Sequence, residues 1–535
     1  GYEDFLSNCL NDLEEIENII EVNLESAVEI EDKEQEENPQ KIANEALGRL
    51  LTKVEDLQSR TQQKWSDIES VIRDGVQKFN ESLLSLLHEG DTQTLQFINA
   101  KYRVQETTKG WQDMLDSRWA RTQDRLALWG RFSWQKSKKY VNEARKIAGF
   151  EEEKVTESHR ADIATYLSET DQKLKELPYI YRRLFNFDAE ADERFYVAVS
   201  DSAIQLEKAY EQWKESYPST VAVVGEKGSG KSTFLNLAAE SHFSEVHSVQ
   251  IILRDTIWSE DVVVELLAEK LEITGAANMN DIVEAIKKND RRRVVILEGI
   301  QNCFIRNVNG YDAIEKLSYL ISETKEQVFW VVSCSRYAWR FLDKIENTSE
   351  YFSHIIRTDT LDAAQIEKVV MNRHRASGYS LQFEAGDSIL RSRSYRKLES
   401  EEDAKELLRK NYFTKLAELG EGNASIAMIF WIRSISEFDD TCFYIRPLEI
   451  TSIEMIEDLS PPVLFTLAAF VMHDTVADAD LSMILNLSKE ESRLMLIRLH
   501  SRGLLVKTNG YYILNHLMYR QIVRVLKERN IIHLV

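Results

Sequence analysis

One segment of the sequence carries residues that could bind a polyphosphate. Residues 221–233 read VAVVGEKGSGKST, an apolar run followed by a glycine-rich turn, a lysine and two hydroxyl side chains. Binding a triphosphate requires backbone amides directed at the anion, a helix N-terminus behind it, a lysine for the β- and γ-phosphates and a hydroxyl for Mg²⁺. The segment supplies each group in the GxxxxGK[ST] spacing, so it predicts a phosphate-binding loop between a strand and a helix.

Nine consecutive residues make up this predicted loop and the first turn of its helix. The glycines allow a tight turn, Lys231 would reach the phosphates, and Ser232 would bind the metal ion. The predicted nucleotide-binding residues are Gly225, Glu226, Lys227, Gly228, Ser229, Gly230, Lys231, Ser232 and Thr233.

A phosphate-binding loop of this kind works with an acid at the end of a second buried strand. The stretch RRRVVILEGIQN places Glu298 at such a strand end, and Gly299 follows it where a second acid is common. We interpret Glu298 as the catalytic residue and as a Mg²⁺ ligand beside Ser232, two roles that one carboxylate performs less well than two. The alternative is a strand-end acid exposed at the edge of the sheet.

A third apolar stretch, QVFWVVSCSRYAWRF, ends in Ser333, Ser335 and Arg336. Ligands of open parallel sheets bind beyond the carboxyl ends of the strands, so these side chains could sense the γ-phosphate. Arg336 is the predicted catalytic cation. The alternative is that Arg336 pairs locally with Asp343 or Glu346.

Short apolar runs alternate with amphipathic helices through the middle of the chain, which predicts a parallel sheet with crossover helices. The predicted strands are residues 220–224, 248–253, 293–297, 328–333 and 354–357. The predicted helices between them are residues 231–240, 260–271, 281–288 and 311–323. Long helices are expected at 38–88 and 111–148, helices again from 358 to about 437, and a hairpin around Asn509 and Gly510 near the end.

The order of these elements resembles the AAA+ and STAND branches of P-loop ATPases and is similar also to origin-recognition initiators. HIIRTDTLDAAQIEKVVMNRHRASG at 354–378 and LAELGEGNASIAMIFWIRSI at 416–435 resemble the helical lid of these proteins, and SCSR at 333–336 resembles the STAND sensor. The resemblance covers residues 195–535. The N-terminal third has no counterpart that we recognise.

The resemblance implies a multidomain α and α/β protein that uses ATP and Mg²⁺ as cofactors. Its predicted domains are an N-terminal helical bundle or coiled-coil arm, a five-stranded parallel P-loop ATPase core, a helical lid and a C-terminal winged helix, with bounds at 1–178, 179–358, 359–455 and 456–535. A GTPase is not expected, because the chain has no Asn-Lys-x-Asp segment after a strand.

Two departures from the resembled pattern bear on catalysis. The stretch ERFYVAVSDSAIQLEKAYEQW before the loop lacks the arginine common there, and Gly422 and Asn423 are followed by Ala424 and Ser425 instead of a lid arginine. Together with the lone acid Glu298, these departures predict ATP binding with slow hydrolysis, as in a switch.

Composition points to an acidic protein with protein partners. The 535 residues carry a formal net charge of −22, which repels nucleic acid and acidic membranes over most of the surface. The four cysteines show no metal-ligand spacing, and no apolar run is long enough to span a bilayer, so a cytoplasmic location is expected. Because the sequence opens on Gly1, an upstream membrane segment stays an open alternative.

Two segments could still contact nucleic acid or a membrane. Residues 118–146 hold nine Lys or Arg against two acids, with interleaved aromatic side chains, although a helix that packs its tryptophans inward is the favoured reading. In the winged helix, KEESRLMLIRLHS at 489–501 could enter a major groove. A protein-contact role is favoured, because DNA-binding modules normally show a clear basic face and the charge from Glu457 onward is close to neutral. Leu494, Leu496, Ile497 and Leu499 are expected to pack, while Arg493, Arg498 and Arg502 leave DNA binding open.

These observations lead to a hypothesis with two alternatives. The hypothesis is a slow ATPase switch that couples its nucleotide state to protein interaction or self-association through the helical arm and the winged helix. The first alternative is a non-catalytic interaction scaffold with a degenerate ATPase fold. The second is an ATPase attached to DNA or to a membrane.

Overall fold

The computed structural model describes most of the chain, and the longest range that it does not describe is residues 89–162. The described residues are 2–32, 39–88, 163–186, 193–197, 202–241, 243, 246–289, 291–358, 361–392, 395, 398, 400–448, 459–508 and 510–532. The predicted helix at 111–148 and the basic segment 118–146 lie outside them. The chain separates into two compact units, Gly1–Leu51 with Glu157–Val535 and, separately, Thr52–Thr156.

Two long helices open the chain. Helix α1 (Tyr2–Asp32) and helix α2 (Pro39–His88) confirm the predicted helical character, and α2 matches the helix expected at 38–88. In α1, Ile19 and Val22 are buried at a spacing of three residues, as one face of an amphipathic helix requires. The prediction that residues 1–178 form a single arm domain, like the other domain bounds, stays a prediction.

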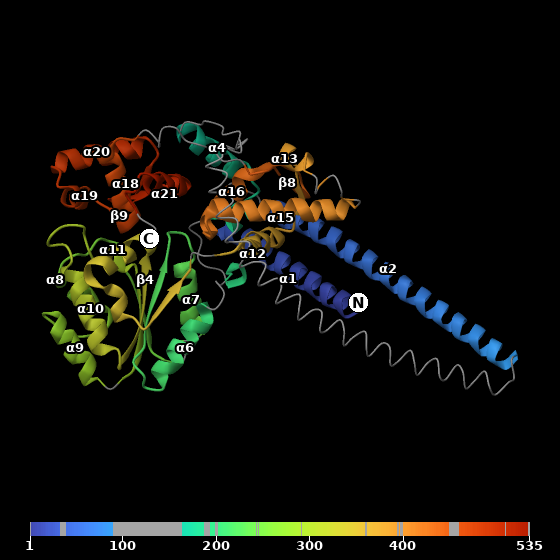
Figure 1. The fold of residues 1–535 in the computed structure, drawn as a ribbon, viewed down its shortest axis with the longest axis horizontal. Helices are drawn as coiled ribbons and strands as arrows, with labels where there is room; N and C mark the ends of the chain where they lie inside the picture. Colours follow the sequence, from blue (N-terminus) through green and yellow to red (C-terminus); the bar gives the residue numbers. More distant parts are fainter. Residues whose placement is uncertain are drawn as a thin grey trace, which may run out of the picture. The chain divides into compact units, whose positions relative to one another are not determined.

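The centre of the larger unit is a five-stranded parallel sheet in the order β2-β3-β4-β1-β5 (Figure 1). Every residue of β1, β3 and β4 is buried, which explains their near-continuous apolar sequence. The five predicted strands are therefore confirmed, with ends shifted by a residue or two. The strands are β1 (Thr220–Gly225), β2 (Ser248–Ile252), β3 (Arg293–Glu298), β4 (Val328–Ser335) and β5 (His354–Arg357).

Helices cover both faces of this sheet (Figure 1). Along β3, Val294 and Ile296 pack with α6 and α7, whereas Val295 and Leu297 pack with the helices of the opposite face. This alternation follows from the two-residue period of a strand. The helices and short 3₁₀ turns are α6 (Ser202–Lys214), α7 (Lys231–Ser241), α8 (Glu260–Lys270), α9 (Met279–Lys288), η2 (Ile300–Asn302), α10 (Asp312–Thr324), α11 (Arg336–Glu346) and η3 (Thr348–Tyr351).

The lid that follows the sheet is helical, as predicted, but it also contains a small sheet that the sequence did not reveal. Its strands pair in the order β6-β8-β7 and are four residues each, too short to show a clear alternating pattern. Helix α5 and Val22 of α1 complete the lid's apolar core. α5 (Tyr179–Leu184) and η1 (Glu193–Phe195) precede the sheet, and the lid elements are α12 (Ala363–Ala376), β6 (Ser380–Phe383), α13 (Asp387–Leu390), α15 (Glu401–Gly420), α16 (Ala424–Ser434), β7 (Ile435–Phe438) and β8 (Cys442–Ile445).

The C-terminal elements form the predicted winged helix, including the helix at 489–501 and the hairpin around residue 510. Their three-stranded sheet has the order β10-β11-β9, and Ile163 and Tyr166 of α4 join their core. Helix α4 (Ile163–Glu176) precedes the sheet in the chain, and the C-terminal elements are α18 (Pro461–His473), β9 (Thr475–Val476), α19 (Asp478–Leu485), α20 (Lys489–Ser501), β10 (Leu505–Thr508), β11 (Tyr511–Leu514), η4 (His516–Met518) and α21 (Tyr519–Glu528).

The predicted packing of α20 was wrong for two of the four residues that were expected to pack. Leu496 and Leu499 are fully buried, but Leu494 and Ile497 are 64% and 45% exposed. The two pairs occupy opposite faces of the helix, because Leu496 and Leu499 repeat at three residues on the face that also buries Ser492. The outward face of α20 is therefore partly apolar.

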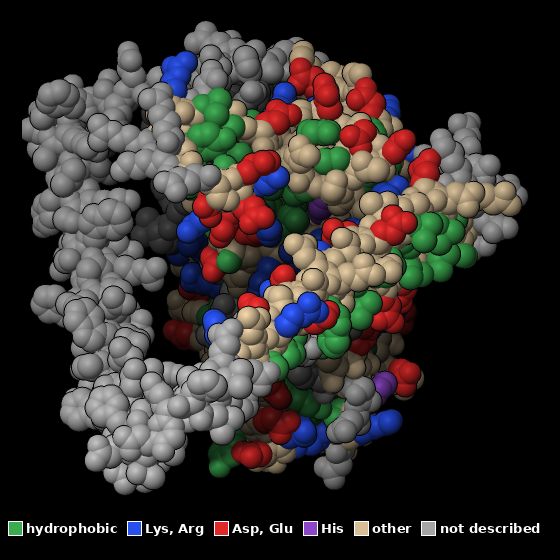
Figure 2. Space-filling view, turned by 90° about the vertical axis from the view of Figure 1, so that its right-hand side faces the viewer, with side chains coloured by type: hydrophobic (Ala, Val, Ile, Leu, Met, Phe, Trp, Pro, Cys, Tyr) green, Lys and Arg blue, Asp and Glu red, His purple; other side chains and the backbone are tan. Residues whose placement is uncertain are grey.

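None of the helices in the described ranges combines the length and the apolar character needed to cross a bilayer. On the described part of the face in Figure 2, acidic side chains are spread widely among the basic ones. All four cysteines carry free thiols.

A buried histidine predicts that acid weakens the winged helix. His473 is 1% exposed at the end of α18 and its ring lies 4.6 Å from that of Phe304. Burial lowers the pKa of His473 from 6.5 to about 4. Between these values the unfolded chain binds a proton that the folded chain does not, so stability present above pH 6.5 is lost as pH falls toward 4, by up to about 3 kcal/mol.

Urea unfolding of the full chain at pH 7 and pH 4.5 measures this loss. The variant His473→Gln provides the control for carboxylates that titrate in the same range. We expect the wild type to lose more stability than the variant between the two pH values. Equal losses would contradict the assignment to His473.

Candidate nucleotide-binding site

The predicted loop joins β1 to α7 in a conformation that depends on its glycines. Gly228 and Gly230 have φ angles of 78° and 86°, in the left-handed region that glycine favours. Gly225 is required for space: a Cβ there would lie 2.3 Å from Thr358 Oγ1 and 2.4 Å from Ser229 Oγ, which hydrogen bond to each other. The loop is thus fixed against the end of β5, as expected for a backbone cradle.

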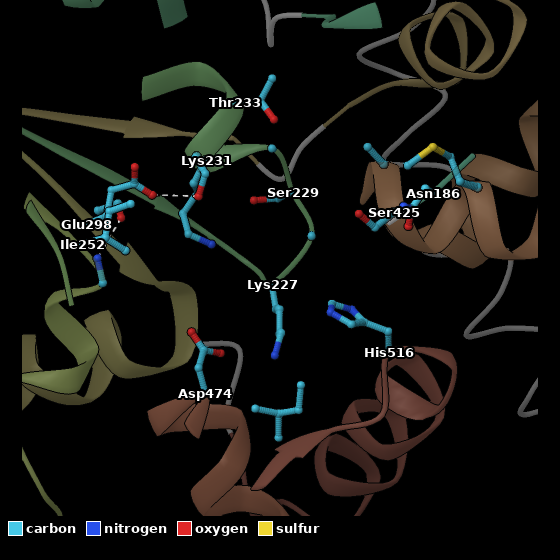
Figure 3. A pocket seen from close by; sticks show the side chains of 18 of the residues that line it. Asn186, Lys227, Ser229, Lys231, Thr233, Ile252, Glu298, Ser425, Asp474 and His516 are labelled. Carbon is cyan, nitrogen blue, oxygen red and sulfur yellow. Dashed lines mark hydrogen bonds between the residues drawn. The ribbon is translucent and has the colours of Figure 1, made fainter. Parts of the chain in front are cut away.

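A cavity of about 920 Å³ opens at this loop. That volume lies in the range that binds small molecules and cofactors. Its walls come from the loop residues 227–233, from the ends of β2 and β3, from the lid, and from the winged helix. Figure 3 shows Asp474 and His516 of the winged helix pointing toward Lys227.

Lys231 lies within the loop. Its Nζ donates to the carbonyl oxygens of Gly225 and Glu226, at 3.0 and 2.9 Å. This places the ammonium group among the loop residues that were predicted to surround the phosphates. Lys227, Gly228, Ser229, Gly230, Lys231, Ser232 and Thr233 all line the cavity.

The two predicted metal ligands are in direct contact. Ser232 Oγ donates to Glu298 Oε2 at 2.7 Å, and Glu298 lies at the end of β3 with 6% of its surface exposed (Figure 3). Mg²⁺ takes few protein ligands and keeps waters and phosphate oxygens in its octahedral shell. A hydroxyl and a carboxylate beside a phosphate-binding loop fit that requirement. Within the described ranges there is no cluster of three or more His, Cys, Asp or Glu that could hold a metal by itself.

Gln250 is a contact of Glu298 that sequence reasoning missed. Its Nε2 donates to Glu298 Oε1 at 2.7 Å and to Asn236 Oδ1 at 2.9 Å. Both Glu298 oxygens therefore accept a hydrogen bond, which fixes the orientation of the carboxylate. Gln250 lies on β2, next to β3, and only the order of the strands identifies it.

The turn after Glu298 is held by Ser333, one of the predicted sensor hydroxyls. The amide of Gly299 donates to Ser333 Oγ at 3.1 Å, and Gly299 has a φ of 84°. A Cβ at Gly299 would lie 2.9 Å from the Leu253 carbonyl oxygen. Ser335 instead caps α11, where its side chain accepts from the Ala338 amide. Only Ser333 of the two lines the cavity.

Arg336 and Glu226 lie against each other, away from the cavity lining. Arg336 Nη1 is 3.2 Å from Glu226 Oε1, and the same oxygen accepts from the Tyr337 hydroxyl at 2.9 Å. Burial raises the pKa of Glu226, but Arg520, Arg336 and Tyr337 more than offset this, so its pKa lies below the ordinary value. Neither Arg336 nor Glu226 is one of the described residues that line the cavity. The predicted contact of Arg336 with the γ-phosphate stays a prediction and would require its release from Glu226.

The lid contacts the loop where the sequence shows no arginine. The amide of Ser425 donates to the Gly228 carbonyl at 3.2 Å, and Asn423 Nδ2 donates to the Lys227 carbonyl at 2.9 Å. A Cβ on Gly228 would lie 2.7 Å from the Ser425 Cβ. The start of α16 is thus packed directly on the loop.

This contact predicts that Gly228→Ala destabilises the protein more than Gly275→Ala. Both glycines have left-handed φ angles, of 78° and 81°, but a Cβ at Gly275 meets nothing within 4 Å. We expect an additional loss of about 1–3 kcal/mol for Gly228→Ala, from overpacking against Ser425. Thermal unfolding of the two variants measures the difference, and Ser425→Gly in the Gly228→Ala background should recover it. Equal losses in both single variants would refute the steric explanation.

The cavity is lined in part by apolar side chains, which suit a nucleobase. Val197, Leu361 and Met428 line it together with Tyr196, whose ring centroid lies 6.4 Å from that of Phe234 on α7. Val22 of α1 also lines it. None of these residues was predicted, because an apolar base pocket assembled from short segments has no spacing signature in the sequence.

The chain was compared with known families and structures. No protein-family model and no curated protein matches it. Cdc6p from Pyrobaculum aerophilum is 13% identical over 65% of this chain and 98% of its own, with a TM-score of 0.34. The ORC2 protein of Aeropyrum pernix, in ADPNP–ADP complexes, is 13% identical over 65% of this chain and 98% of its own, with a TM-score of 0.38.

A third solved structure is the Walker-type ATPase paby2304 of Pyrococcus abyssi. It is 11% identical over 64% of this chain and 99% of its own, with a TM-score of 0.31. With identities this low and TM-scores below 0.5, these structures support no conclusion about function, which depends on the geometry of the loop and its cavity.

Proposed function

We propose that this protein is an ATP-binding switch with slow hydrolysis, which couples its nucleotide state to interactions with other proteins or with further copies of itself. The observation that carries the proposal is the cavity, whose walls come from the phosphate loop, the lid and the winged helix together. A ligand that contacts all three modules would change their relative free energies when it binds or is hydrolysed.

The residues of the cavity divide into three roles in this proposal. The loop amides and Lys231 would bind the phosphates, and Tyr196, Leu361 and Met428 would contact the base. Ser232 and Glu298 would hold Mg²⁺, which supplies charge neutralisation for the phosphates when bound. Glu298 would also orient the attacking water or accept its proton.

Slow turnover is supported by the surroundings of Glu298 and Arg336. Glu298 accepts hydrogen bonds from Ser232 and Gln250, so it would have to serve the metal ion and the water with one constrained carboxylate. Arg336 contacts Glu226 in this conformation, so it would have to leave that carboxylate before it could reach a phosphate. Binding is therefore better supported than rapid catalysis.

Nucleotide titration combined with size measurement tests the proposal. We expect about one ATP to bind per chain in the presence of Mg²⁺ and the molecular mass to respond to the nucleotide if self-association is the output. Wild-type protein that binds neither ATP nor ADP would remove the proposal. ATP binding without any phosphate release would favour the interaction scaffold.

The winged helix is proposed to contact protein. Leu494 and Ile497 are exposed on α20, on the face that a major-groove reading would turn to DNA. Apolar side chains at such a position favour a protein surface over a phosphate backbone. Salt-sensitive duplex binding that is lost on replacing Arg493, Arg498 and Arg502 together would overturn this preference.

A further inference from the structure

The phosphate loop contains a buried carboxylate whose charge opposes its function. Glu226 is the second residue of the loop and is 1% exposed. A carboxylate so close to a polyphosphate site repels the ligand unless other charges neutralise it. A buried carboxylate is also costly unless it is paired. The groups that neutralise Glu226 therefore bear on whether the loop can bind an anion.

One of those groups comes from the winged helix. Arg520 of α21 places Nη2 2.8 Å from Glu226 Oε2 and is 7% exposed, while Arg336 and the Tyr337 hydroxyl contact Oε1. The two guanidinium groups and the carboxylate together carry one net positive charge beside the loop. Removal of Arg520 alone would leave that cluster with no net charge.

Arg520 also joins the loop to the lid. The same Nη2 donates to the Gly420 carbonyl at 2.8 Å, and Nη1 lies 3.0 Å from Glu421 Oε2. Gly420 and Glu421 end α15 directly before the turn that leads to Asn423 and the loop. One buried side chain of the winged helix thus contacts the phosphate loop and the lid at once.

We infer that Arg520 is a positioning residue for nucleotide binding: by pairing with Glu226 it allows the loop to accept a polyphosphate, so nucleotide affinity depends on docking of the winged helix. This inference rests on the proposed ATP binding. Coupling between two equilibria is reciprocal, so a bound nucleotide strengthens docking of α21 by the same factor by which docking strengthens nucleotide binding. Docking of the winged helix then changes the nucleotide affinity of the loop through the charge of Glu226.

A double-mutant cycle on the full chain tests the inference, with ATP and ADP titrated calorimetrically in the presence of Mg²⁺. Arg520→Met leaves Glu226 short of one partner, and we expect the dissociation constants to rise by about 5- to 150-fold. Glu226→Gln removes the charge that needs neutralising. The double variant should therefore bind within about threefold of Glu226→Gln alone. An equal loss from Arg520→Met in both backgrounds would overturn the inference.

Control variants separate this effect from damage to the fold. Lys527→Met removes a side chain of the same helix whose Nζ lies 2.6 Å from Glu421 Oε2. Its charge lowers the pKa of Glu226 less than the charges of Arg520 and Arg336 do, so affinity should fall much less than in Arg520→Met. If Arg520→Met does not fold, Arg520→Gln, which also removes the charge but keeps a polar side chain, takes its place in the two Glu226 backgrounds. A Lys527→Met loss as large as that of Arg520→Met would assign the effect to the lid contact and refute a role for Glu226.

Hydrogen exchange of the α21 amides gives a second measurement. A purely structural role of Arg520 would not make this exchange depend on ATP. ATP should increase protection of the amides in α21 in the wild type and leave them unchanged in the double variant. Failure of the underlying proposal looks different: wild-type protein would then bind no nucleotide, or Lys231→Ala would bind it equally well. If the wild type binds nucleotide and binding depends on Lys231, but Glu226 and Arg520 show no coupling, only this inference is refuted. The proposed ATP binding then stands.

Discussion

Replacing Lys231 by alanine should raise the dissociation constant for ATP by about 10- to 150-fold, because a hydrogen bond to a charged group contributes about 1.5–3 kcal/mol. Lys231 Nζ lies within the loop, bound to the carbonyls of Gly225 and Glu226, and a phosphate would exchange those weak contacts for a charge-assisted pair. Isothermal titration with ATP and Mg²⁺ measures the change.

Lys227→Ala is the matched control for this variant. Lys227 belongs to the same loop and lines the same cavity, so its removal subtracts an equal charge. Lys227 is half-buried, and none of its interactions with the loop matches the two carbonyl contacts of Lys231, so we expect a clearly smaller effect than that of Lys231→Ala. If both variants raise the dissociation constant for ATP by the same factor, the loop attracts the nucleotide only through its overall charge. The specific role proposed for Lys231 would then be wrong.

The second large effect is expected for Glu298→Gln. The amide keeps the size of the side chain but cannot accept a proton or neutralise a metal ion. Single-turnover phosphate release should therefore fall by about 10²- to 10⁴-fold. The ATP dissociation constant should change far less, since most phosphate contacts come from the loop. Quenched-flow or phosphate-sensor assays at saturating ATP measure the rate.

Gln250→Ala serves as the graded comparison. Gln250 donates to Glu298 Oε1 at 2.7 Å without being a predicted ligand of the metal ion. Loss of such an orienting contact commonly costs about 10- to 100-fold. A ranking in which Gln250→Ala is slower than Glu298→Gln, or in which Glu298→Gln keeps full turnover, would show that Glu298 is not the catalytic carboxylate.

The loop and the sheet could be predicted because their signals are local. The phosphate-binding pattern fixes residue types at adjacent positions, and the central strands are buried on both faces, so they appear as unbroken apolar runs. The winged-helix hairpin was marked by Asn509 and Gly510 in the same local way. Ser232 and Glu298 were expected to meet because both follow buried parallel strands.

What could not be predicted depends on contacts between distant segments. Arg336 and Arg520 contact Glu226 although they lie 110 and 294 residues away from it in the sequence. A single sequence does not indicate contacts between residues so far apart. Gln250 lies on an edge strand with mixed exposure, so nothing marked it as a neighbour of Glu298. Leu494 and Ile497 were misjudged because apolar residues on two faces of α20 appeared in one short run.

Helix α1 provides a path for mechanical force to the cavity. Val22 lines the cavity, and on the same stretch of helix Glu21 and Glu25 pair with Arg194 at 2.9 and 3.0 Å. A helix of 31 residues is a stiff rod that passes a pull or a rotation at one end to the other. Tension on the first turns of the chain would therefore reach the cavity without passing through a loop, and a ligand bound there would in turn resist that tension.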